Sequence, residues 1–557
     1  MSYPPTLSGE DERELVQVSI DYALSHGLVL RPVDLSSLAA SIHAPYSLYP
    51  SRFPRTLFER AIELQPLYND LYARVTTDRD FLDQVVGHDV AQVDHFQKRL
   101  YDIYKTVQQE GVKQPISLGI FRSDYLIHAP ATTQSAATTS PPPPPPPTLK
   151  QVEFNTISSS FGALSTRVSQ LHRFLVETKQ YPDDDDLLRN SNNLPENRAL
   201  EGIARGLVDA HAAYAEQQQQ RRRELAIMMV IQDDERNAFD QRLIEWHVKQ
   251  QHRVGLVRIP FSQLRTTLSI CPETSALLYT PPPPSTSSSS SSPEQGGGGP
   301  GRTIEISVVY YRTAYSPDDY YTEQEWSTRL LVERSSSIKC PSVAMQLAGC
   351  KKVQQVLSDP RQLERFFPSS HDDDDEERRT RRIKLLQDSF VGLYGMSDED
   401  RGEEFARNEP NRFVLKPQRE GGGNNIYRDD IPRFLDQLAR QDQQEEQQSN
   451  SGNQEEEEKK KKKGKEGYIL MELIEPPLGV DQVLLKAGQQ VPVRTDVVSE
   501  LGIYGITLLK ERLREGEGGC QVLKNETVGH LLRTKARESD EGGIAVGFSV
   551  LDSPLLV

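Results

Sequence analysis

The sequence has few cysteines and no long apolar run, and both shortages exclude classes of protein. Four cysteines occur among 557 residues, and none lies in a CxxC pair or at another metal-ligand spacing. We therefore expect free thiols in a reducing compartment, without a disulfide framework. The longest apolar runs, such as residues 225–231, are far shorter than the ~20 residues that cross a bilayer. The first residues also lack the basic-then-apolar order of a signal peptide, so we expect a cytoplasmic protein outside the membrane.

The chain is also short of positive charge. Its formal net charge is -16 at pH 7, whereas a nucleic-acid binder needs a basic field for its phosphate contacts. We therefore expect no nucleic-acid partner. The hydrophobic fraction of 36% lies below the roughly 45–50% of ordinary globular chains, and part of the deficit falls in low-complexity tracts. The length suffices for about two or three cores at ~100–200 residues each.

Four low-complexity tracts interrupt the chain, at residues 141–147, 281–301, 371–379 and 441–465. The first is a run of prolines, which predicts an exposed polyproline II extension of a hairpin; an SH3 or WW ligand is the alternative. The second is rich in proline, serine and glycine and cannot form a core. The acidic third tract and the fourth, which passes from glutamine and glutamate to lysine, are expected to be disordered loops. Lysines 459–463 also fit a nuclear-localisation signal, although the neighbouring glutamates oppose their charge.

Residues 416–427, KPQREGGGNNIY, have the composition of a phosphate-binding loop. They follow a predicted strand at 412–415 and precede a helix that we expect to begin near 429–432. The adjacent glycines leave no Cβ between a triphosphate and the backbone N–H groups. Lys416 can place a charge on phosphate oxygens, and Glu420 is a hard oxygen ligand for the magnesium that accompanies ATP. The segment is not a Walker A loop, and by itself it also fits a flexible surface loop.

Polar side chains also end the strands predicted at residues 116–122 and 149–155. Arg122 closes the first strand. Glu153 and Asn155 stand two apart on the second, so both point to one face and can reach one magnesium ion. The carboxyl end of a strand is where α/β folds place their ligands. A turn capped by the serines that follow is the alternative interpretation.

The middle of the chain predicts an α/β unit. Strand 225–231, helix 237–250 and strand 254–259 have the order of a βαβ motif, and a charged loop follows the first strand. A further strand at 303–311 also ends in polar residues. We interpret residues 221–345 as a separate domain.

Other segments give weaker signals. Helical periodicity dominates residues 10–110, which we interpret as scaffold. Lys351 and Lys352 lie in a helical stretch and either serve a nucleotide or are solvated. A strand predicted at 468–474 is apolar enough to be central, and its backbone suits an adenine edge. Four adjacent aspartates at 183–186 repel one another, so we interpret them as solvated and not as a metal site.

Eight motifs together resemble those of the eukaryotic glutathione synthetase family, in the same order over nearly the whole chain. They are RSDY, EFNTISSSFG, DERNAFDQR, QLAGCKKVQQ, FVLKPQREGGGNNIY, YILME, SELGIYG and HLLRTKA. The chain departs from the family in its low-complexity inserts and in small changes such as Phe154 and Val546. The resemblance implies an α/β ATP-grasp fold with an α/β substrate-binding domain inserted at 221–345. Residues 1–220 would form a helical N-terminal scaffold and one ATP-grasp portion, and residues 346–557 a second portion with a glycine-rich lid and a C-terminal small-residue loop.

The resemblance also implies a homodimeric enzyme that uses ATP as co-substrate and Mg²⁺ as cofactor. ATP would phosphorylate the cysteinyl carboxylate of γ-glutamylcysteine, and the glycine amine would attack the acyl phosphate to give glutathione, ADP and phosphate. Two rivals are a ligase of the same scaffold with another acceptor, such as β-alanine, and a catalytically silent nucleotide-binding protein. The presence of Glu153, Asn155, Lys416 and Glu420 argues against the silent protein.

Carried over by matching motif, the site residues fall into four groups. Charge neutralisation and alignment at the reacting atoms would come from Arg122, Lys416 and Arg533. The magnesium ligands would be Glu153, Asn155 and Glu420. The substrate contacts would be Arg122, Ile157, Ser158, Ser159, Ser160, Glu235, Arg236, Asn237, Gln241, Arg312, Thr313, Ala314, Tyr315, Arg533, Ile544 and Ala545. The ATP contacts would be Glu153, Lys351, Lys416, Pro417, Gln418, Arg419, Glu420, Gly421, Gly422, Gly423, Asn424, Asn425, Tyr427, Met471, Glu472, Leu473, Ile474, Glu500, Lys535 and Glu541. The glycine loop and residues 542–547 would close over the site as lids.

Overall fold

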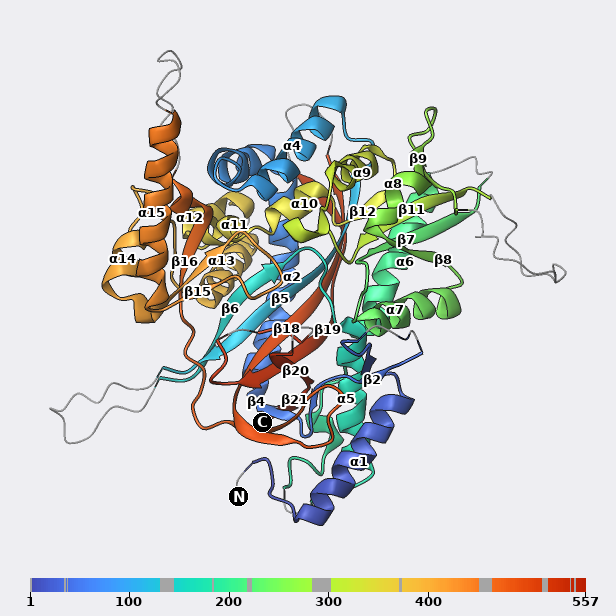
Figure 1. Ribbon diagram of the computed structural model, residues 1–557, viewed down its shortest axis with the longest axis vertical. Coiled ribbons are helices and arrows are strands. Elements are labelled where there is room, and N and C mark those ends of the chain that lie inside the picture. The colour runs from blue at the N-terminus through green and yellow to red at the C-terminus, as the bar shows by residue number, and fades with distance from the viewer. Residues whose placement is uncertain are drawn as a thin grey trace.

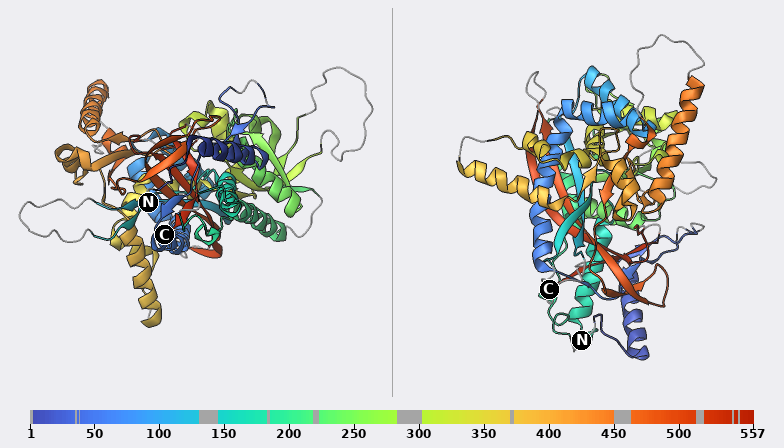
Figure 2. Two further views of the ribbon diagram at one scale, coloured as in Figure 1. Left: turned by 90° about the horizontal axis from the view of Figure 1, so that it is seen from below. Right: turned by 90° about the vertical axis from the view of Figure 1, so that its left-hand side faces the viewer.

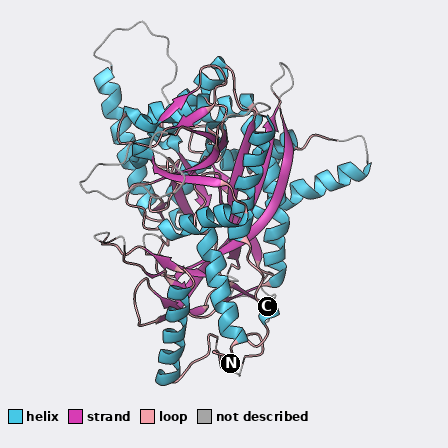
Figure 3. Ribbon diagram, turned by 90° about the vertical axis from the view of Figure 1, so that its right-hand side faces the viewer, coloured by secondary structure: helices cyan, strands magenta, loops and turns pink. Residues whose placement is uncertain are grey.

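The chain is a mixed α/β protein, as the sequence predicts, with strands inside and helices around them (Figure 3). The structure is a computed structural model. It describes residues 3–34, 37, 39–130, 145–182, 185–217, 223–282, 302–369, 373–449, 463–512, 519–540, 542–544 and 547–557.

One sheet of 13 strands runs through the middle of the molecule (Figure 1). At its centre β5 (Ile116–His128) pairs antiparallel with β6 (Thr148–Asn155) on one side and with β18 (Val493–Glu511) on the other. β18 pairs in turn with β19 (Cys520–Ala536). The two strands predicted on either side of the proline run are therefore antiparallel neighbours. The first is longer than predicted, because β5 continues to His128 and Arg122 lies inside it and not at its end. The sheet continues beyond β19 through β20 (Ser549–Asp552), β3 (Tyr46–Ser47) and β17 (Asp481–Leu485).

The predicted βαβ unit lies at the other end of this sheet. β7 (Leu225–Ile231), α7 (Ala238–Gln251) and β8 (Gly255–Pro260) follow one another, and the two strands pair in parallel. β12 (Ile338–Cys340) pairs with β5 through Lys339 and Ser117, so the unit shares its sheet with the rest of the chain. The domain boundaries at residues 220 and 345 therefore stay predictions. The other elements here are α8 (Leu264–Thr267), β9 (Leu268–Ile270), β10 (Leu277–Tyr279), β11 (Ile304–Tyr311) and α9 (Glu323–Arg334).

Helices cover both faces of the central strands because side chains alternate along a strand. Leu501 and Ile503 of β18 join the core cluster of α2 (Arg55–Thr77), whereas Ile506 joins the cluster of α6 (Ala199–Gln217). The predicted N-terminal scaffold is largely helical. The elements that complete this part are α1 (Gly9–Ser25), β1 (Val29–Leu30), β2 (Ile42–His43), β4 (Ser51–Phe53), α3 (Arg79–Leu82), a π-helical segment (Asp83–Val90), α4 (His95–Glu110) and α5 (Gly162–Glu177).

A second sheet of four strands carries the glycine-rich segment. β14 (Phe413–Pro417) pairs on one side with β16 (Tyr468–Glu472) and on the other with β15 (Ile426–Tyr427), before α15 (Asp430–Ser449) begins. The helix predicted to begin near residues 429–432 is confirmed, since α15 begins at Asp430. The glycine loop, however, first closes a hairpin between β14 and β15, which the sequence did not predict. A strand of two residues is too short to leave a period in the sequence. The remaining elements are α10 (Val343–Ala348), α11 (Lys351–Leu357), α12 (Pro360–Phe366), β13 (Leu393–Tyr394), α14 (Gly402–Asn408) and β21 (Pro554–Leu556).

The acidic tract is not the disordered loop that the sequence predicted. Residues 373–379 form the first turns of α13 (Asp373–Ser389), which projects from the body (Figure 2). Acidic side chains in the first turn favour the positive end of the helix dipole. An ion pair one turn apart, Arg379–Glu376 at 2.7 Å, adds to this preference.

The fourth tract is likewise helical where it is described. Residues 441–449 continue α15, because glutamine and glutamate are good helix formers. Residues 141–144, 283–301 and 450–462 lie outside the described parts of the chain, as do Asp183 and Asp184.

Shortening the second low-complexity tract tests whether this insert contributes to the stability of the fold. Tyr279 of β10 pairs with Ile304 of β11, so the chain leaves and re-enters the sheet at neighbouring positions. Replacing residues 283–300 by about six Gly and Ser residues should change the free energy of unfolding by about 1 kcal/mol or less, because loop-closure entropy grows only as (3/2)RT ln n. Urea denaturation of the variant and the unaltered chain measures this. Loss of the folded state would contradict the expectation.

Candidate active site

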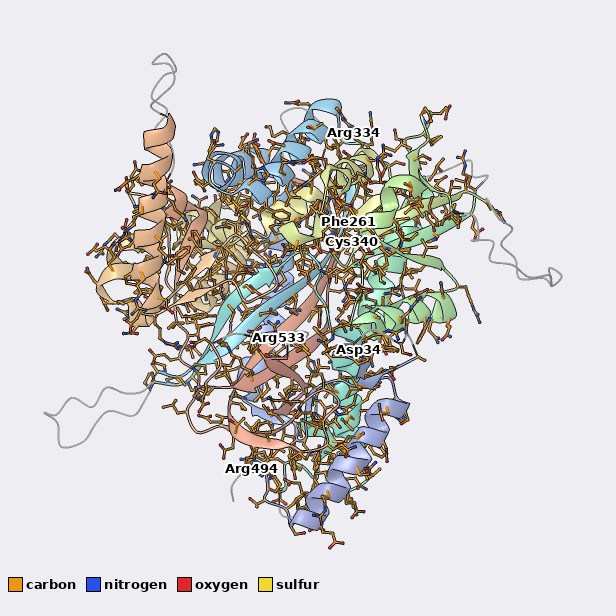
Figure 4. The ribbon with its side chains drawn as sticks, in the orientation of Figure 1. Asp34, Phe261, Arg334, Cys340, Arg494 and Arg533 are labelled. Carbon is orange, nitrogen blue, oxygen red and sulfur yellow. The ribbon has the colours of Figure 1, made fainter. Side chains whose placement is uncertain are left out.

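A cleft of about 460 Å³ lies where the two sheets meet. Residues of β5, β6, β14, β16, β18 and β19 line it together with α11, the glycine loop and the loop before β20. Figure 4 places Arg533 at the centre of the molecule, among these strands. The cleft collects most of the predicted site residues, namely Arg122, Glu153, Asn155, Ile157, Ser158, Ser159, Ser160, Glu235, Asn237, Arg312, Tyr315, Lys351, Lys416, Arg419, Glu420, Gly421, Gly422, Asn424, Asn425, Tyr427, Met471, Glu472, Leu473, Ile474, Glu500, Arg533, Lys535 and Ile544.

Lys351 lies between two carboxylates of the cleft. Its Nζ is 3.0 Å from Glu153 Oε2 on β6 and 3.0 Å from both carboxylate oxygens of Glu420 in the glycine loop. Burial opposes ionisation of Glu153, but Lys351 and Lys416 outweigh it and hold the pKa of this carboxyl well below its usual range. Burial raises the pKa of Glu420, although Lys351 opposes the shift. Lys416 is buried on β14, which lowers the pKa of its amine, and donates to Val152 O at 3.1 Å.

The predicted magnesium ligands are brought together by strand geometry. Glu153 and Asn155 stand two apart on β6, and both line the cleft with Glu420. The Asn155 amide donates to Arg122 O at 3.1 Å and to Asp124 Oδ2 at 3.0 Å, which leaves its carbonyl oxygen as the available donor atom for a cation. No three His, Cys, Asp or Glu side chains of the described residues form a metal cluster. Two carboxylates and one amide nevertheless fit Mg²⁺, which takes few protein oxygens and completes its shell with water and phosphate.

A second set of alternating charges lies across the cleft. Arg122 binds Asp124 through Nε at 2.7 Å and Nη2 at 2.8 Å, and Arg533 Nη2 reaches Asp124 Oδ2 at 2.9 Å. Arg533 also pairs with Glu500, its cross-strand neighbour. Burial alone would lower the pKa of Arg122, but Asp124 keeps it above its usual range. Burial raises the pKa of Glu500 in spite of Arg533.

The serine loop before α5 is tied to the βαβ unit by one buried carboxylate. Asp240 on α7 accepts from the backbone N–H groups of Phe161 at 3.0 Å and Ala163 at 2.8 Å, at the N-terminus of α5. It also accepts from Arg312 Nη2 at 2.9 Å. The serine residues and Arg312 therefore face the cleft as one unit. At this end of the cleft, the Glu235 carboxylate accepts a hydrogen bond from the backbone N–H of Asn237 at 2.7 Å.

Several predicted residues lie behind the cleft wall. Gln241 is buried and donates to Glu235 Oε2 at 2.6 Å, and Gln418 accepts from Lys352 N at 3.0 Å. Gln241 therefore supports a residue that lines the cleft, and Gln418 holds the backbone directly after Lys351. The others that do not line it are Arg236, Thr313, Ala314, Pro417 and Gly423. Glu541 and Ala545 lie outside the described residues.

Two loops touch at the mouth of the cleft. A Cβ on Gly422 would lie 3.1 Å from Gly542 O, and φ of Gly422 is +70°, so glycine is required for this approach. Arg428 pairs with Asp540 at 2.7 Å, and Tyr427 donates to Asp540 O at 3.3 Å. The sequence analysis had not singled out Arg428 or Asp540, and no motif in the sequence marks them.

A family model described as the ATP-binding domain of eukaryotic glutathione synthase matches residues 9–556. The chain belongs to the eukaryotic glutathione synthase family. It is 35% identical to glutathione synthetase of Xenopus laevis over 98% of this chain and 97% of the relative, and 34% identical to that of Homo sapiens over 97% and 96%. A glutathione synthetase-like effector from Globodera pallida, solved in its apo form, shares the fold with a TM-score of 0.65 at 20% identity, covering 99% of this chain and 98% of that one.

The glutathione synthetase of Solanum lycopersicum, which is 34% identical to this chain, is chloroplastic. It covers 93% of this chain and 78% of the relative. Among the described helices, none is both long and apolar enough to cross a membrane.

The position of Lys351 generates a prediction about stability. Lys351→Met removes the cation between Glu153 and Glu420, so we expect the free energy of unfolding to fall by about 2 kcal/mol, and added Mg²⁺ to restore part of it. Thermal melts with and without Mg²⁺ measure both effects.

Lys352→Met is the matched control, because Lys352 follows in the same helix and does not line the cleft. An equal loss in both variants, or no response of Lys351→Met to Mg²⁺, would contradict this account of the cleft.

Proposed function

We propose that the protein ligates γ-glutamylcysteine to glycine at the expense of ATP, giving glutathione, ADP and phosphate. This proposal rests on the composition of one cleft. The cleft holds lysines and carboxylates suited to a nucleotide and its metal, beside arginines suited to the carboxylates of the substrates. The γ-phosphoryl group moves to the cysteinyl carboxylate, the glycine amine attacks that carbon, and phosphate leaves with its bridging oxygen. Membership of the family supports this reaction.

In this proposal the fold is an ATP-grasp, and ATP lies between the small sheet and the central strands. Lys351 and Lys416 face the triphosphate and neutralise its charge in a cleft of low dielectric. The backbone of residues 471–474 lies along the adenine edge, and Glu500 and Lys535 close the nucleotide site. The mostly apolar Met471, Leu473 and Ile474 support this placement.

Magnesium would be held by Glu153, Asn155 and Glu420. When bound, it would neutralise negative charge on the phosphates. Lys351, which pairs with both carboxylates, would supply its positive charge to the phosphates. Lys416 would add a second positive charge beside the phosphates, on a backbone held by β14.

γ-Glutamylcysteine would lie along the serine loop, the 235–237 loop and residues 312–315. Arg122 and Arg312 supply guanidinium groups for carboxylates, and Glu235 supplies an anion for the amino group. Arg533 and Ile544 take the glycine. Closure of the two touching loops keeps water from the acyl phosphate.

We further propose a homodimer in the cytoplasm. The dimer follows from the family resemblance, and the compartment is supported by the four cysteines, all of which are free thiols.

Substrate-dependent ATP turnover tests the function. ADP release should require γ-glutamylcysteine and glycine together, and glutathione should form in equal amount. Glu420→Gln and Glu153→Gln should each lower turnover by about 10²-fold at limiting Mg²⁺, because each removes a metal ligand. Coupled ADP assays over a Mg²⁺ series measure this.

Glu403→Gln is a suitable control, since Glu403 lies on α14 away from the cleft. Unchanged turnover of folded Glu420→Gln at limiting Mg²⁺ would contradict the assignment of Glu420 as a metal ligand. ATP turnover without γ-glutamylcysteine would contradict the proposed ligase activity.

The acceptor end generates a further prediction. Arg533→Ala should raise the KM of glycine by at least about 10-fold and that of ATP much less, because only glycine loses a bidentate partner. β-Alanine carries one more methylene and should be a poor acceptor, by about 1–3 kcal/mol in kcat/KM. Steady-state kinetics with both acceptors measure these effects. Equal efficiency of the two acceptors, or an unchanged glycine requirement in Arg533→Ala, would overturn this placement.

A further inference from the structure

Asp124 is a fully buried carboxylate that sits directly beneath the cleft. It is 0% exposed and belongs to β5, between β6 and β18. Three side chains that line the cleft donate to it: Arg122 at 2.7 and 2.8 Å, Asn155 at 3.0 Å and Arg533 at 2.9 Å. Asp124 does not line the cleft itself. It therefore reaches any substrate only through these three neighbours.

The sheet register explains why the four groups meet. Arg122 and Asp124 stand two apart on β5 and share a face, while Asn155 of β6 pairs with Arg122 across the strands. On the other side, Gly502 of β18 pairs with Asp124. A Cβ on Gly502 would lie 2.7 Å from Asp124 Oδ1 and 2.8 Å from Arg122 Cδ, so this glycine makes room for the ion pair.

Each contact with Asp124 limits one neighbour to one orientation. Two hydrogen bonds to Arg122 hold the guanidinium plane, and its remaining Nη1 donates to Ser160 O at 3.3 Å in the serine loop. The Asn155 amide has both hydrogens engaged, by Asp124 and Arg122 O, which turns its carbonyl oxygen away from them. Arg533 donates from one nitrogen, Nη2, to both Asp124 and Glu500, which fixes the position of that nitrogen.

We propose that Asp124 is a positioning residue of the ligation, which orients the side chains for γ-glutamylcysteine, for glycine and for the metal relative to one another. This inference rests on the proposed function. Because misplacement by about 1 Å costs about 10²-fold in rate, a single carboxylate that aligns three groups has a large effect on turnover without touching a reactant.

Asp124→Asn tests the proposal, since it keeps the side-chain volume but offers one acceptor oxygen in place of two. We expect kcat to fall by about 10²-fold and the affinity for γ-glutamylcysteine, measured by calorimetry without ATP, to fall by at least about 10-fold. At saturating Mg²⁺ the KM of ATP should change by less than about threefold, because the hydrogen bonds of Lys351 and Lys416 go to groups other than Asp124.

Asp552→Asn is the matched control. Asp552 is 1% exposed on β20, accepts from Ser51 and Thr534, and does not line the cleft. This variant should lower the melting temperature while leaving kcat and both substrate affinities within about twofold. Loss of a buried carboxylate as such is thereby separated from loss of alignment.

Two further variants locate the effect. Gly502→Ala retains every polar group but crowds Asp124 and Arg122, so it should lower kcat by about 10-fold and weaken γ-glutamylcysteine with little change for ATP. Adding Asp124→Asn to Arg122→Ala should weaken γ-glutamylcysteine by no more than about twofold beyond Arg122→Ala alone, because Asp124 acts through Arg122.

The outcomes that overturn the proposal are distinct from failure of the function. If Asp124→Asn resembles Asp552→Asn, or weakens ATP as much as γ-glutamylcysteine, Asp124 only balances buried charge. If Asp124→Asn does not fold, Gly502→Ala decides by the same criteria. A wild-type chain that forms no glutathione overturns the proposed function instead, and the calorimetric comparison, which needs no turnover, still decides the role of Asp124.

Discussion

A cleft built to receive a triphosphate must keep its own charges balanced before the ligand arrives. Lys351, with its ammonium between Glu153 and Glu420, meets this constraint on one side of the cleft. Isolated charges would be far too costly at this depth, and Lys351, Arg122 and Arg533 each pair with a carboxylate. The order of elements around the cleft is therefore inseparable from its electrostatics: the sheets position the charges, and the charges hold the sheets together.

The cross-strand register of the central sheet decides which charges meet. Glu500 faces Arg533, and Arg122 faces Asn155, because β18 pairs with β19 and β5 with β6 at those positions. A slip of one residue would turn each of these side chains to the opposite face of the sheet, among the apolar residues of the core. The long β5 and β18, with many apolar neighbours on both faces, make such a slip costly.

The sequence predicted those parts of the molecule whose cause is local. The βαβ unit follows from one apolar run and one amphipathic helix, and the polar residues at the strand ends, such as Glu153 and Asn155, are found in the cleft. Asp124 was visible in a motif, but its burial depends on strands that lie hundreds of residues apart in the chain. The short β15 and the acidic start of α13 were missed, because one has no measurable period and the other resembles a solvated tract until its helix dipole is considered.

The last strands of the chain pair with some of the first. β20 lies beside β3 and β21 beside β4, and both marked ends of the chain lie at the same end of the molecule (Figure 1). β5 likewise finds its partner β18 only after residue 500. During synthesis from the N-terminus, the nascent chain therefore presents unpaired strand edges until residues 493–556 have been made. We therefore expect folding of this protein to depend more on chaperones that bind nascent chains than folding of a protein whose sheets are built from consecutive strands. We also expect its truncated products to be degraded faster.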